Sequence, residues 1–254
     1  MTHRTITREN SHNVAGAYFR AVTAGPERAL VEWFLDQRLF PTPRGCKTTL
    51  LIEPSLESGF PDVVLVHWHA KTADNWSLQR KQLDSVDLKI LHYLSSVRHS
   101  THQELVVRFP RILNRRLERL LVSGLIRRTK DLWIARPIQE NFAVRSIIAL
   151  EAKITNWQSA VRQAVLNKWF ANESYVLLPS IPNSGKFIAE IDSHQIGVVT
   201  QNDCAVRKPL LVSNGFPRSY ASWLLNEWVC LAEMTPSECD FYETGMGHRA
   251  VSRD

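Results

Sequence analysis

The chain has 254 residues, of which 44% are hydrophobic and 22% charged, and its formal net charge is +6. This length and composition suit a globular protein of one large domain or two smaller ones. No apolar run approaches the roughly 18–20 residues that span a bilayer, and residues 1–16 lack the apolar core of a secretory signal, so we expect no membrane partner. The four cysteines include no CxxC pair, which favours reduced thiols and a cytoplasmic location.

The first eighty residues predict a helix packed against a sheet. Residues 26–39, PERALVEWFLDQRL, place proline at the first helical position and carry one apolar stripe, which is typical of an amphipathic helix. Residues 47–54 and 61–68 are rich in apolar and β-branched side chains. They predict two strands, the second of them central in its sheet.

The next segment changes to helical periodicity. We predict three helices, at residues 85–97, 100–109 and 110–123, the third ended by Gly124, and a hairpin at 127–137. Three short helices followed by a hairpin is the order of elements in a winged helix-turn-helix. The stretch from Thr101 to Arg128 resembles the winged-helix domains of bacterial transcription regulators, with a Thr-x-x-Glu-Leu start and a Gly-Leu-Ile-Arg-Arg exit.

Positive charge is concentrated in this same segment. Residues 81–136 hold twelve Lys and Arg against five Asp and Glu, a net charge of +7 that leaves −1 for the rest of the chain. Such an asymmetry favours a polyanion as the partner of this segment.

An alternation of strands and helices follows the basic segment. We predict a strand at 146–154, a helix at 155–172, a strand at 174–180, a helix at 183–194 and a strand at 195–201. This β-α-β-α-β order predicts an α/β sheet with parallel pairs. A final amphipathic helix is expected over 217–232, followed by a loose tail.

Two charged residues interrupt the apolar run IIALEAKITNW of residues 147–157. Side chains two residues apart in a strand share a face, so Glu151 and Lys153 should lie side by side, with Ile148, Leu150 and Ala152 on the opposite face. By themselves these two residues favour a half-exposed ion pair at a strand end. The alternative is a catalytic pair.

The motifs FPD at 60–62 and EAK at 151–153, each on an apolar strand, resemble the PD-(D/E)XK nuclease superfamily. The resemblance implies a restriction-endonuclease-like α/β core, a mixed sheet flanked by helices. It also implies that Asp62 and Glu151 bind Mg²⁺, or Mn²⁺ in its place. Lys153 would orient the attacking water or stabilise the charge that develops at phosphorus.

The same resemblance implies two further residues. Gln163 occupies the position of a glutamine on the helix that follows the second motif. The family often has an acidic residue on its first helix, for which Glu32 is the preferred candidate and Glu27 the weaker one. Asp62 and Glu151 lie 89 positions apart, which exceeds the family's short hairpin, and a compact domain inserted at a surface turn accounts for most of the excess.

Phosphodiester hydrolysis gives a physical reason for such a set. Negative charge develops on the phosphate and leaving oxygens, and hard oxygen ligands hold the Mg²⁺ that neutralises it and acidifies a bound water. Two carboxylates from adjacent strands and a neighbouring ammonium meet this need. Glu53, on the strand before Asp62, is a candidate extra metal ligand, although an exposed strand end is the simpler reading of it.

The segment 110–130 carries the candidate DNA-binding residues. In a winged helix the third helix enters the major groove, where Arg and Asn reach base edges, and the wing contacts phosphates. The candidates are Arg111, Asn114, Arg115, Arg116, Arg119, Arg127, Arg128 and Lys130. The alternative is a solvated basic face on a domain that forms a homodimer or binds a protein partner.

The sequence therefore predicts a Mg²⁺-dependent endodeoxyribonuclease, a phosphodiesterase whose partner is double-stranded DNA, acting in restriction, phage defence or DNA repair. Its predicted parts are a nuclease core at 1–80 and 139–232, an inserted winged helix at 81–138 and a tail at 233–254. The alternative is a non-catalytic DNA-binding or regulatory protein on a nuclease-like scaffold, and action on RNA is a weaker third reading. Burying the charges of Asp62, Glu151 and Lys153 costs desolvation energy. A non-catalytic scaffold does not need these charges, so their presence favours the enzyme.

Overall fold

The structure is a computed structural model that describes residues 4–8, 17–74, 76–111, 113–212 and 215–234. The predicted tail at 233–254 begins inside the last helix and otherwise lies outside the described residues.

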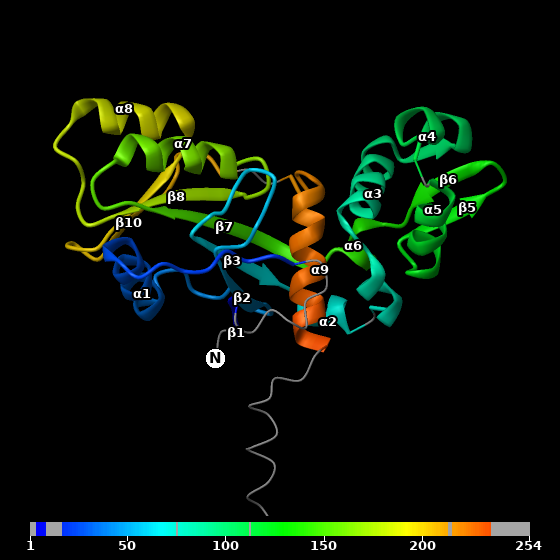
Figure 1. Cartoon of the computed structure of the whole chain (residues 1–254), viewed down its shortest axis with the longest axis horizontal. Helices are drawn as coiled ribbons and strands as arrows, with labels where there is room; N and C mark the ends of the chain where they lie inside the picture. The colour runs from blue at the N-terminus through cyan, green and yellow to red at the C-terminus, as the bar shows by residue number, and fades with distance from the viewer. Residues whose placement is uncertain (1–3, 9–16, 75, 112, 213–214, 235–254) are drawn as a thin grey trace, which may run out of the picture.

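A seven-stranded mixed sheet forms the larger part of the molecule (Figure 1). Its strands, in spatial order, are β1 (Arg4–Ile6), β2 (Lys47–Ile52), β3 (Val63–Trp68), β7 (Val144–Ala152), β8 (Glu173–Leu178), β9 (Gly197–Thr200) and β10 (Ala205–Arg207). The pairs β7–β8 and β8–β9 are parallel, which confirms the predicted parallel end, whereas β2–β3 and β3–β7 are antiparallel. The predicted central position of β3 is also confirmed.

Helices cover both faces of this sheet. Successive side chains of β7 point to opposite faces, so this strand packs against helices on both sides. Ile148, Leu150 and Ala152 pack in one cluster with α1 (Pro26–Gln37), as the predicted alternation requires. The other face is covered by α7 (Trp157–Asn167) and α8 (Gly185–His194) at one end. At the other end of that face lies α9 (Tyr220–Met234).

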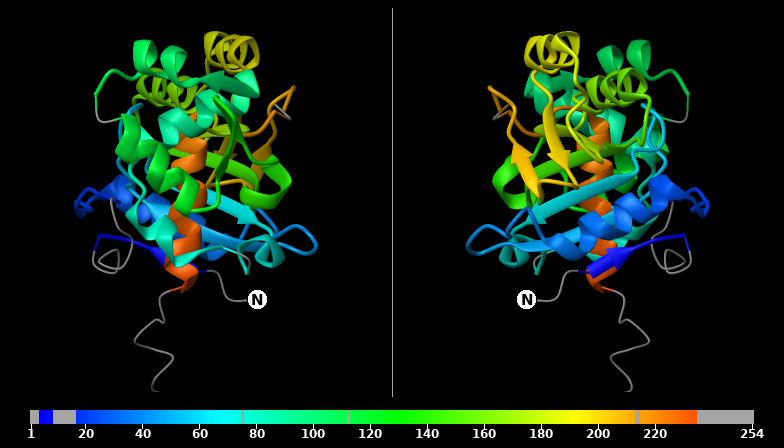
Figure 2. Two further views of the ribbon diagram at one scale, coloured as in Figure 1. Left: turned by 90° about the vertical axis from the view of Figure 1, so that its right-hand side faces the viewer. Right: turned by 90° about the vertical axis from the view of Figure 1, so that its left-hand side faces the viewer.

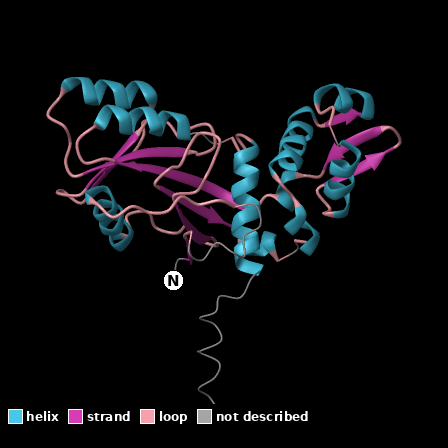
Figure 3. Ribbon diagram, in the orientation of Figure 1, coloured by secondary structure: helices cyan, strands magenta, loops and turns pink. Residues whose placement is uncertain are grey.

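A smaller unit of three helices and a three-stranded sheet lies on the side of α9 that faces away from the seven-stranded sheet (Figure 3). Its elements are α3 (Ser85–Val97), β4 (His99–Thr101), α4 (His102–Arg108), α5 (Leu113–Val122), β5 (Ile126–Thr129) and β6 (Leu132–Ala135). The strand order is β4-β6-β5. Asp84 and Thr101 each form a capping box, which fixes where α3 and α4 begin.

The smaller unit packs on the sheet region through α9 (Figures 1 and 2). Buried side chains of α3, α5 and β6 belong to the same apolar cluster as Trp223 and Trp228 of α9 and Val64 and Val66 of β3. Three short elements connect the two parts, namely α2 (Ala70–Ala73), η2 (Leu78–Gln82) and α6 (Ile138–Asn141). A buried ion pair between Arg80 of η2 and Glu227 of α9, 2.6 Å long, reinforces the junction. None of the described helices is long and apolar enough to cross a membrane.

Several predicted boundaries change in the structure. The helix predicted at 100–109 begins at His102, because His99–Thr101 pairs with β6 as strand β4 and Thr101 serves as the helix cap. The third helix ends next to Gly124 as predicted, because Gly124 adopts a left-handed backbone (φ 73°). It begins at Leu113 instead of Pro110. The three-residue edge strands β1 and β10 have no counterpart in the sequence-based prediction.

Candidate active site and basic surface

Three carboxylates occupy one row at the ends of three neighbouring strands. Val63 pairs with both Ile52 and Leu150, so the residues just beyond these pairs, Glu53, Asp62 and Glu151, continue the row across β2, β3 and β7. The Glu53 amide donates to the Asp62 carbonyl at 3.1 Å, which extends the β2–β3 ladder to this row. The two predicted motifs are thus neighbours in space although Asp62 and Glu151 lie 89 positions apart in the chain.

Glu151 is the most deeply buried member of the row. It is 2% exposed, and its Oε1 accepts a 2.6 Å hydrogen bond from Nδ2 of Asn167, a buried residue at the end of α7. Its other oxygen, Oε2, is buried and has no hydrogen-bond partner among the described residues. The predicted half-exposed ion pair at Glu151 is therefore wrong, since Lys153 binds a different carboxylate.

Asp62 ties the end of β3 to the end of β7. Its Oδ2 accepts a 2.7 Å hydrogen bond from the Ala152 backbone amide, and its side chain is 13% exposed. This bond fixes the carboxylate beside Glu151 and leaves Oδ1 available on the other side. The Arg20 guanidinium lies 3.9 Å from that Oδ1.

The Asp62 and Glu53 carboxylates face a polar cavity of about 320 Å³, whose wall also includes Lys153, Gln163 and residues of α1. Lys153 Nζ donates to Glu27 Oε2 at 3.0 Å and to the Ala152 carbonyl at 2.9 Å. Arg20 Nε donates to Glu53 Oε2 at 3.0 Å. Cations and carboxylates therefore alternate around the cavity.

Mutual repulsion and burial disfavour ionisation of the row. Burial and the nearby Asp62 carboxylate raise the pKa of Glu151 to about 8. The same two causes raise the pKa of Glu53 to about 6, against the opposing effect of Arg20. Burial also raises the pKa of Asp62, although the Ala152 amide and Lys153 favour its charged form. The positive charge near Glu151 is therefore too weak to offset the effects of burial and of Asp62 on its pKa.

The structure brings most of the predicted catalytic residues together. Asp62, Lys153 and Gln163 line one cavity, and the row of strand ends adds Glu151. Glu53 joins them as well: its side chain is 12% exposed, which contradicts the reading of an exposed strand end.

Glu32 does not belong to this group. It forms a 2.6 Å salt bridge with Arg28 one turn earlier on α1, its side chain is 56% exposed, and it does not line the cavity. Glu27, the weaker candidate in the sequence, lines the cavity and holds Lys153. The stripe of α1 that meets the sheet contains Leu30, Val31 and Phe34, and this stripe directs Glu27 rather than Glu32 toward the strand ends.

Two oxygens in this site have the chemistry of Mg²⁺ ligands. Within the described part of the chain, no group of three or more His, Cys, Asp and Glu side chains has the arrangement of a metal site. Mg²⁺ sites nevertheless often use one or two carboxylates together with water and substrate phosphate. Glu151 Oε2, buried without a partner, and the carboxylate of Asp62 beside it fit such a site. Glu53 is the weaker fit, because Arg20 already binds it.

The predicted DNA-binding residues fall into two classes. Six of them are exposed and lie on α5, just before it, or on the β5–β6 hairpin, namely Arg111, Asn114, Arg115, Arg127, Arg128 and Lys130. Arg128 also stacks over the Trp133 ring, with its guanidinium carbon 5.3 Å from the ring centroid. These six residues are accessible to a partner.

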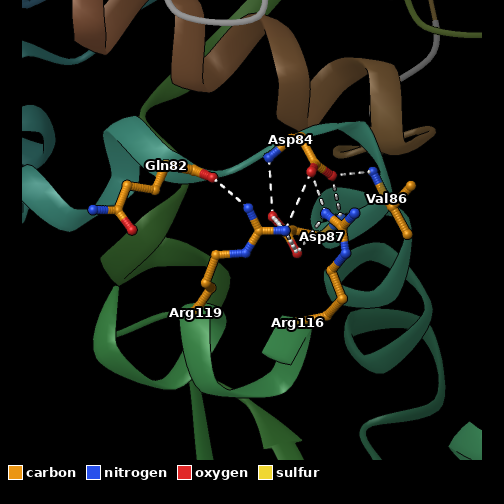
Figure 4. Close-up of polar contacts among 6 residues, drawn as sticks. All are labelled: Gln82, Asp84, Val86, Asp87, Arg116 and Arg119. Carbon is orange, nitrogen blue, oxygen red and sulfur yellow. Dashed lines mark hydrogen bonds and ion pairs between the residues drawn. The ribbon is translucent and has the colours of Figure 1, made fainter. Parts of the chain in front are cut away.

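Arg116 and Arg119 form the second class, because they bind carboxylates of the neighbouring helix (Figure 4). Arg116 Nη1 contacts Asp84 and lies 3.2 Å from Asp87, while Arg119 Nη2 lies 3.1 Å from Asp87. Arg119 also donates to the Gln82 carbonyl at 2.8 Å. The Asp87 side chain is completely buried, so these two arginines hold α5 against the start of α3 rather than facing a partner.

Two residues of the site escaped the sequence analysis. Asn167 follows Gln163 by one helical turn, so the spacing on α7 could have indicated it. Arg20 precedes the first helix in a segment without periodicity, and no sequence signal places it near Glu53. Comparison with protein-family models, with curated proteins and with solved structures finds no match to this chain.

Proposed function

We propose that the protein is a Mg²⁺-dependent endonuclease that cleaves phosphodiester bonds of double-stranded DNA. The observation that carries the proposal is the placement of Asp62 and Glu151 on adjacent strand ends, linked by the Asp62–Ala152 hydrogen bond, beside Lys153 and Gln163. The arrangement matches what the PD-(D/E)XK resemblance implies for these residues, and the mixed sheet supports a core of that kind.

Each residue has a role that its surroundings support. Asp62 and Glu151 would hold the divalent cation, which supplies charge neutralisation and a more acidic bound water. Asn167 holds the Glu151 carboxylate in place. Lys153 Nζ, kept at the strand end by Glu27 and the Ala152 carbonyl, would stabilise negative charge on the phosphate. Gln163 Oε1 is buried without a partner among the described residues, and it would accept a hydrogen bond from the attacking water.

The smaller unit would bind the DNA duplex. Its element order, with three helices and the sheet order β4-β6-β5, supports the winged-helix reading of this segment. The third helix, α5, exposes Asn114 and Arg115 for the major groove, and the hairpin exposes Arg127, Arg128 and Lys130 for phosphates. Arg116 and Arg119 would not contact the DNA, because their guanidinium groups bind Asp84 and Asp87.

A second candidate function is a DNA-binding protein without catalysis. It is favoured by the pairing already present in the cavity, where Arg20 binds Glu53 and Lys153 binds Glu27. In that case these contacts would be permanent, and Mg²⁺ would have no effect on bound DNA.

Plasmid cleavage distinguishes the two candidates. Supercoiled plasmid and a linear duplex are incubated with the full chain in Mg²⁺, in Mn²⁺ and in EDTA, beside the Asp62→Asn variant. The nuclease proposal expects nicked or linear product with either cation and none with EDTA or with the variant. Binding of duplex without cleavage in either cation would overturn the nuclease proposal and support the second candidate.

A further inference from the structure

Arg20 faces two members of the row formed by Glu53, Asp62 and Glu151. Its Nε and Nη2 both donate to Glu53 Oε2, at 3.0 and 2.5 Å, and Nη2 lies 3.9 Å from Asp62 Oδ1. Glu151, at the other end of the row, is bound by Asn167 instead. The Arg20 guanidinium therefore lies beside the Glu53 and Asp62 carboxylates, whereas Glu151 Oε2 has no partner among the described residues.

Pairing and packing of the chain hold Arg20 in this place. Its backbone amide donates to the Glu53 carbonyl at 3.0 Å, and the preceding residue, Phe19, forms an antiparallel bridge with Pro54. Phe19 is 2% exposed and belongs to the apolar core. The Arg20 guanidinium carbon also lies 5.2 Å from the centroid of the Phe60 ring. The fold thus places this cation next to the strand ends.

The two carboxylates beside Arg20 need a positive charge. The Glu53 and Asp62 side chains are only 12% and 13% exposed, so water screens their mutual repulsion poorly. An opposite charge within about 4–6 Å favours the charged form of such groups. Arginine remains protonated in proteins, so Arg20 supplies this charge permanently.

Arg20 also occupies the position where a second metal ion would find its ligands. Some nucleases use two divalent cations, about 3.5–4 Å apart, to stabilise the attacking and the leaving oxygens. A second ion beside Asp62 would draw on Asp62 Oδ1 and on Glu53, the remaining carboxylate of the row. The guanidinium already binds Glu53, and its charge repels a divalent cation from the oxygen ligands that Mg²⁺ requires.

We propose that Arg20 replaces a second metal ion, so that the site binds a single divalent cation, held by Asp62 and Glu151. The inference rests on the proposed function, because it takes this carboxylate pair as the ligands of the cation. Arg20 then supplies the second positive charge of the site as a fixed guanidinium. Its side chain is 52% exposed and lines the cavity, so a phosphate oxygen can accept a hydrogen bond from it.

Counting bound Mn²⁺ tests the proposal without any measurement of cleavage. Electron paramagnetic resonance of free Mn²⁺, during titration of the full chain without DNA, gives the number of ions bound per chain. We expect one ion on the wild type and two on Arg20→Gln, because the variant leaves Glu53 and Asp62 Oδ1 free to bind a cation. Arg20→Lys retains the charge and should bind one ion. The double variant Arg20→Gln/Glu53→Gln should also bind one, which locates the additional ion at Glu53.

Arg28→Gln is the matched control. It removes an arginine from the wall of the same cavity, but the carboxylate that it releases is Glu32, which is 56% exposed and lies outside the row. This variant should bind one ion.

The outcomes separate this inference from the proposed function. Two ions on the wild type, one ion on folded Arg20→Gln, or two ions on the double variant would overturn the role of Arg20 and leave the proposed function in place. No bound ion on the wild type would overturn the Mg²⁺-dependent function and this inference with it. Thermal unfolding in EDTA shows whether each variant is folded. The wild-type count decides the matter by itself if Arg20→Gln does not fold.

Discussion

The Asn167 side-chain amide donates to Glu151 Oε1 at 2.6 Å, and both residues are 2% exposed. Asn167 ends α7 and Glu151 lies near the end of β7, so the bond fixes the helix that carries Gln163 against the strand that carries Glu151. A hydrogen bond to the charged form of a buried carboxyl lowers its pKa, which opposes the effect of burial here.

Asn167→Ala should therefore raise the pKa of Glu151 further and weaken Mg²⁺ binding by roughly tenfold, which is the usual loss when a residue that hydrogen-bonds a metal ligand is removed. The pH profile of cleavage would move to higher pH as well. Calorimetry with Mg²⁺ and rates between pH 6 and 10 provide the measurement. Gln158→Ala, at an exposed position of the same helix, is the control. A variant that loses stability yet keeps the wild-type profile would reduce Asn167 to a packing role.

Glu151 should make folding stability depend on pH in the absence of metal. Its pKa rises from 4.5 to about 8 on folding. Between these values the folded chain retains a proton that the unfolded chain releases, so stability falls as pH rises through this window. In EDTA, Glu151→Gln should be more stable than the wild type at pH 8, by on the order of a few kcal/mol, and the difference should vanish near pH 4.5.

Urea unfolding at several pH values measures this difference. Glu190→Gln, on the exposed side of α8, should parallel the wild type throughout. Parallel curves for Glu151→Gln and wild type would mean that Glu151 is ionised in the folded protein at neutral pH.

Lys153→Gln should slow cleavage while leaving the fold intact. Loss of one donor that stabilises transition-state charge lowers the rate by roughly 10²–10³-fold in comparable electrostatic sites. Single-turnover rates at saturating Mg²⁺ and DNA isolate this step from binding. Lys186→Gln, on the exposed surface of α8, is the matched control. Wild-type rates for Lys153→Gln would leave Lys153 only its structural contact with Glu27.

The two classes of arginine on α5 should respond differently to substitution. Arg116→Ala leaves the buried Asp87 with one cation fewer and should lower the free energy of unfolding by about 1–3 kcal/mol. Arg115→Ala is exposed and should change stability by less than about 0.5 kcal/mol. It should instead weaken duplex binding, because Arg115 is proposed to reach base edges in the major groove. Urea unfolding and filter binding at several salt concentrations distinguish the classes, and a duplex affinity unaffected by Arg115→Ala would point to a protein partner for this surface.

Most of the sheet and its helices could be predicted because their apolar patterns are long. Residues 63–68 and 144–152 are nearly continuous buried runs, and α3 occupies its predicted range because Asp84 and Asp87 form a capping box at its start. Strands β1, β4 and β10 could not be predicted, since three residues give no measurable periodicity and their pairing depends on distant partners.

The candidate site likewise contains residues whose placement could be predicted from the sequence and residues whose placement could not. Glu151 lies on β7, and Asp62 and Lys153 lie next to the ends of β3 and β7, strands whose register the apolar pattern sets, so their neighbourhood could be predicted from the sequence. The choice between Glu27 and Glu32 depends on how α1 rotates against the sheet, and the roles of Arg116 and Arg119 depend on acidic partners 29–35 residues earlier. Charge counts along a chain do not show which charges are already paired in the fold.

Cleavage of supercoiled plasmid by Glu151→Gln, beside wild type and Glu190→Gln, tests the central claim most directly. Glutamine preserves the size of the side chain and removes the charge proposed to hold Mg²⁺, while Glu190 lies on the exposed face of α8. Our account predicts Mg²⁺-dependent nicking by wild type and by Glu190→Gln, and no product above the EDTA background with Glu151→Gln. Equal cleavage by all three proteins would contradict the assignment of the row formed by Glu53, Asp62 and Glu151 as the active site.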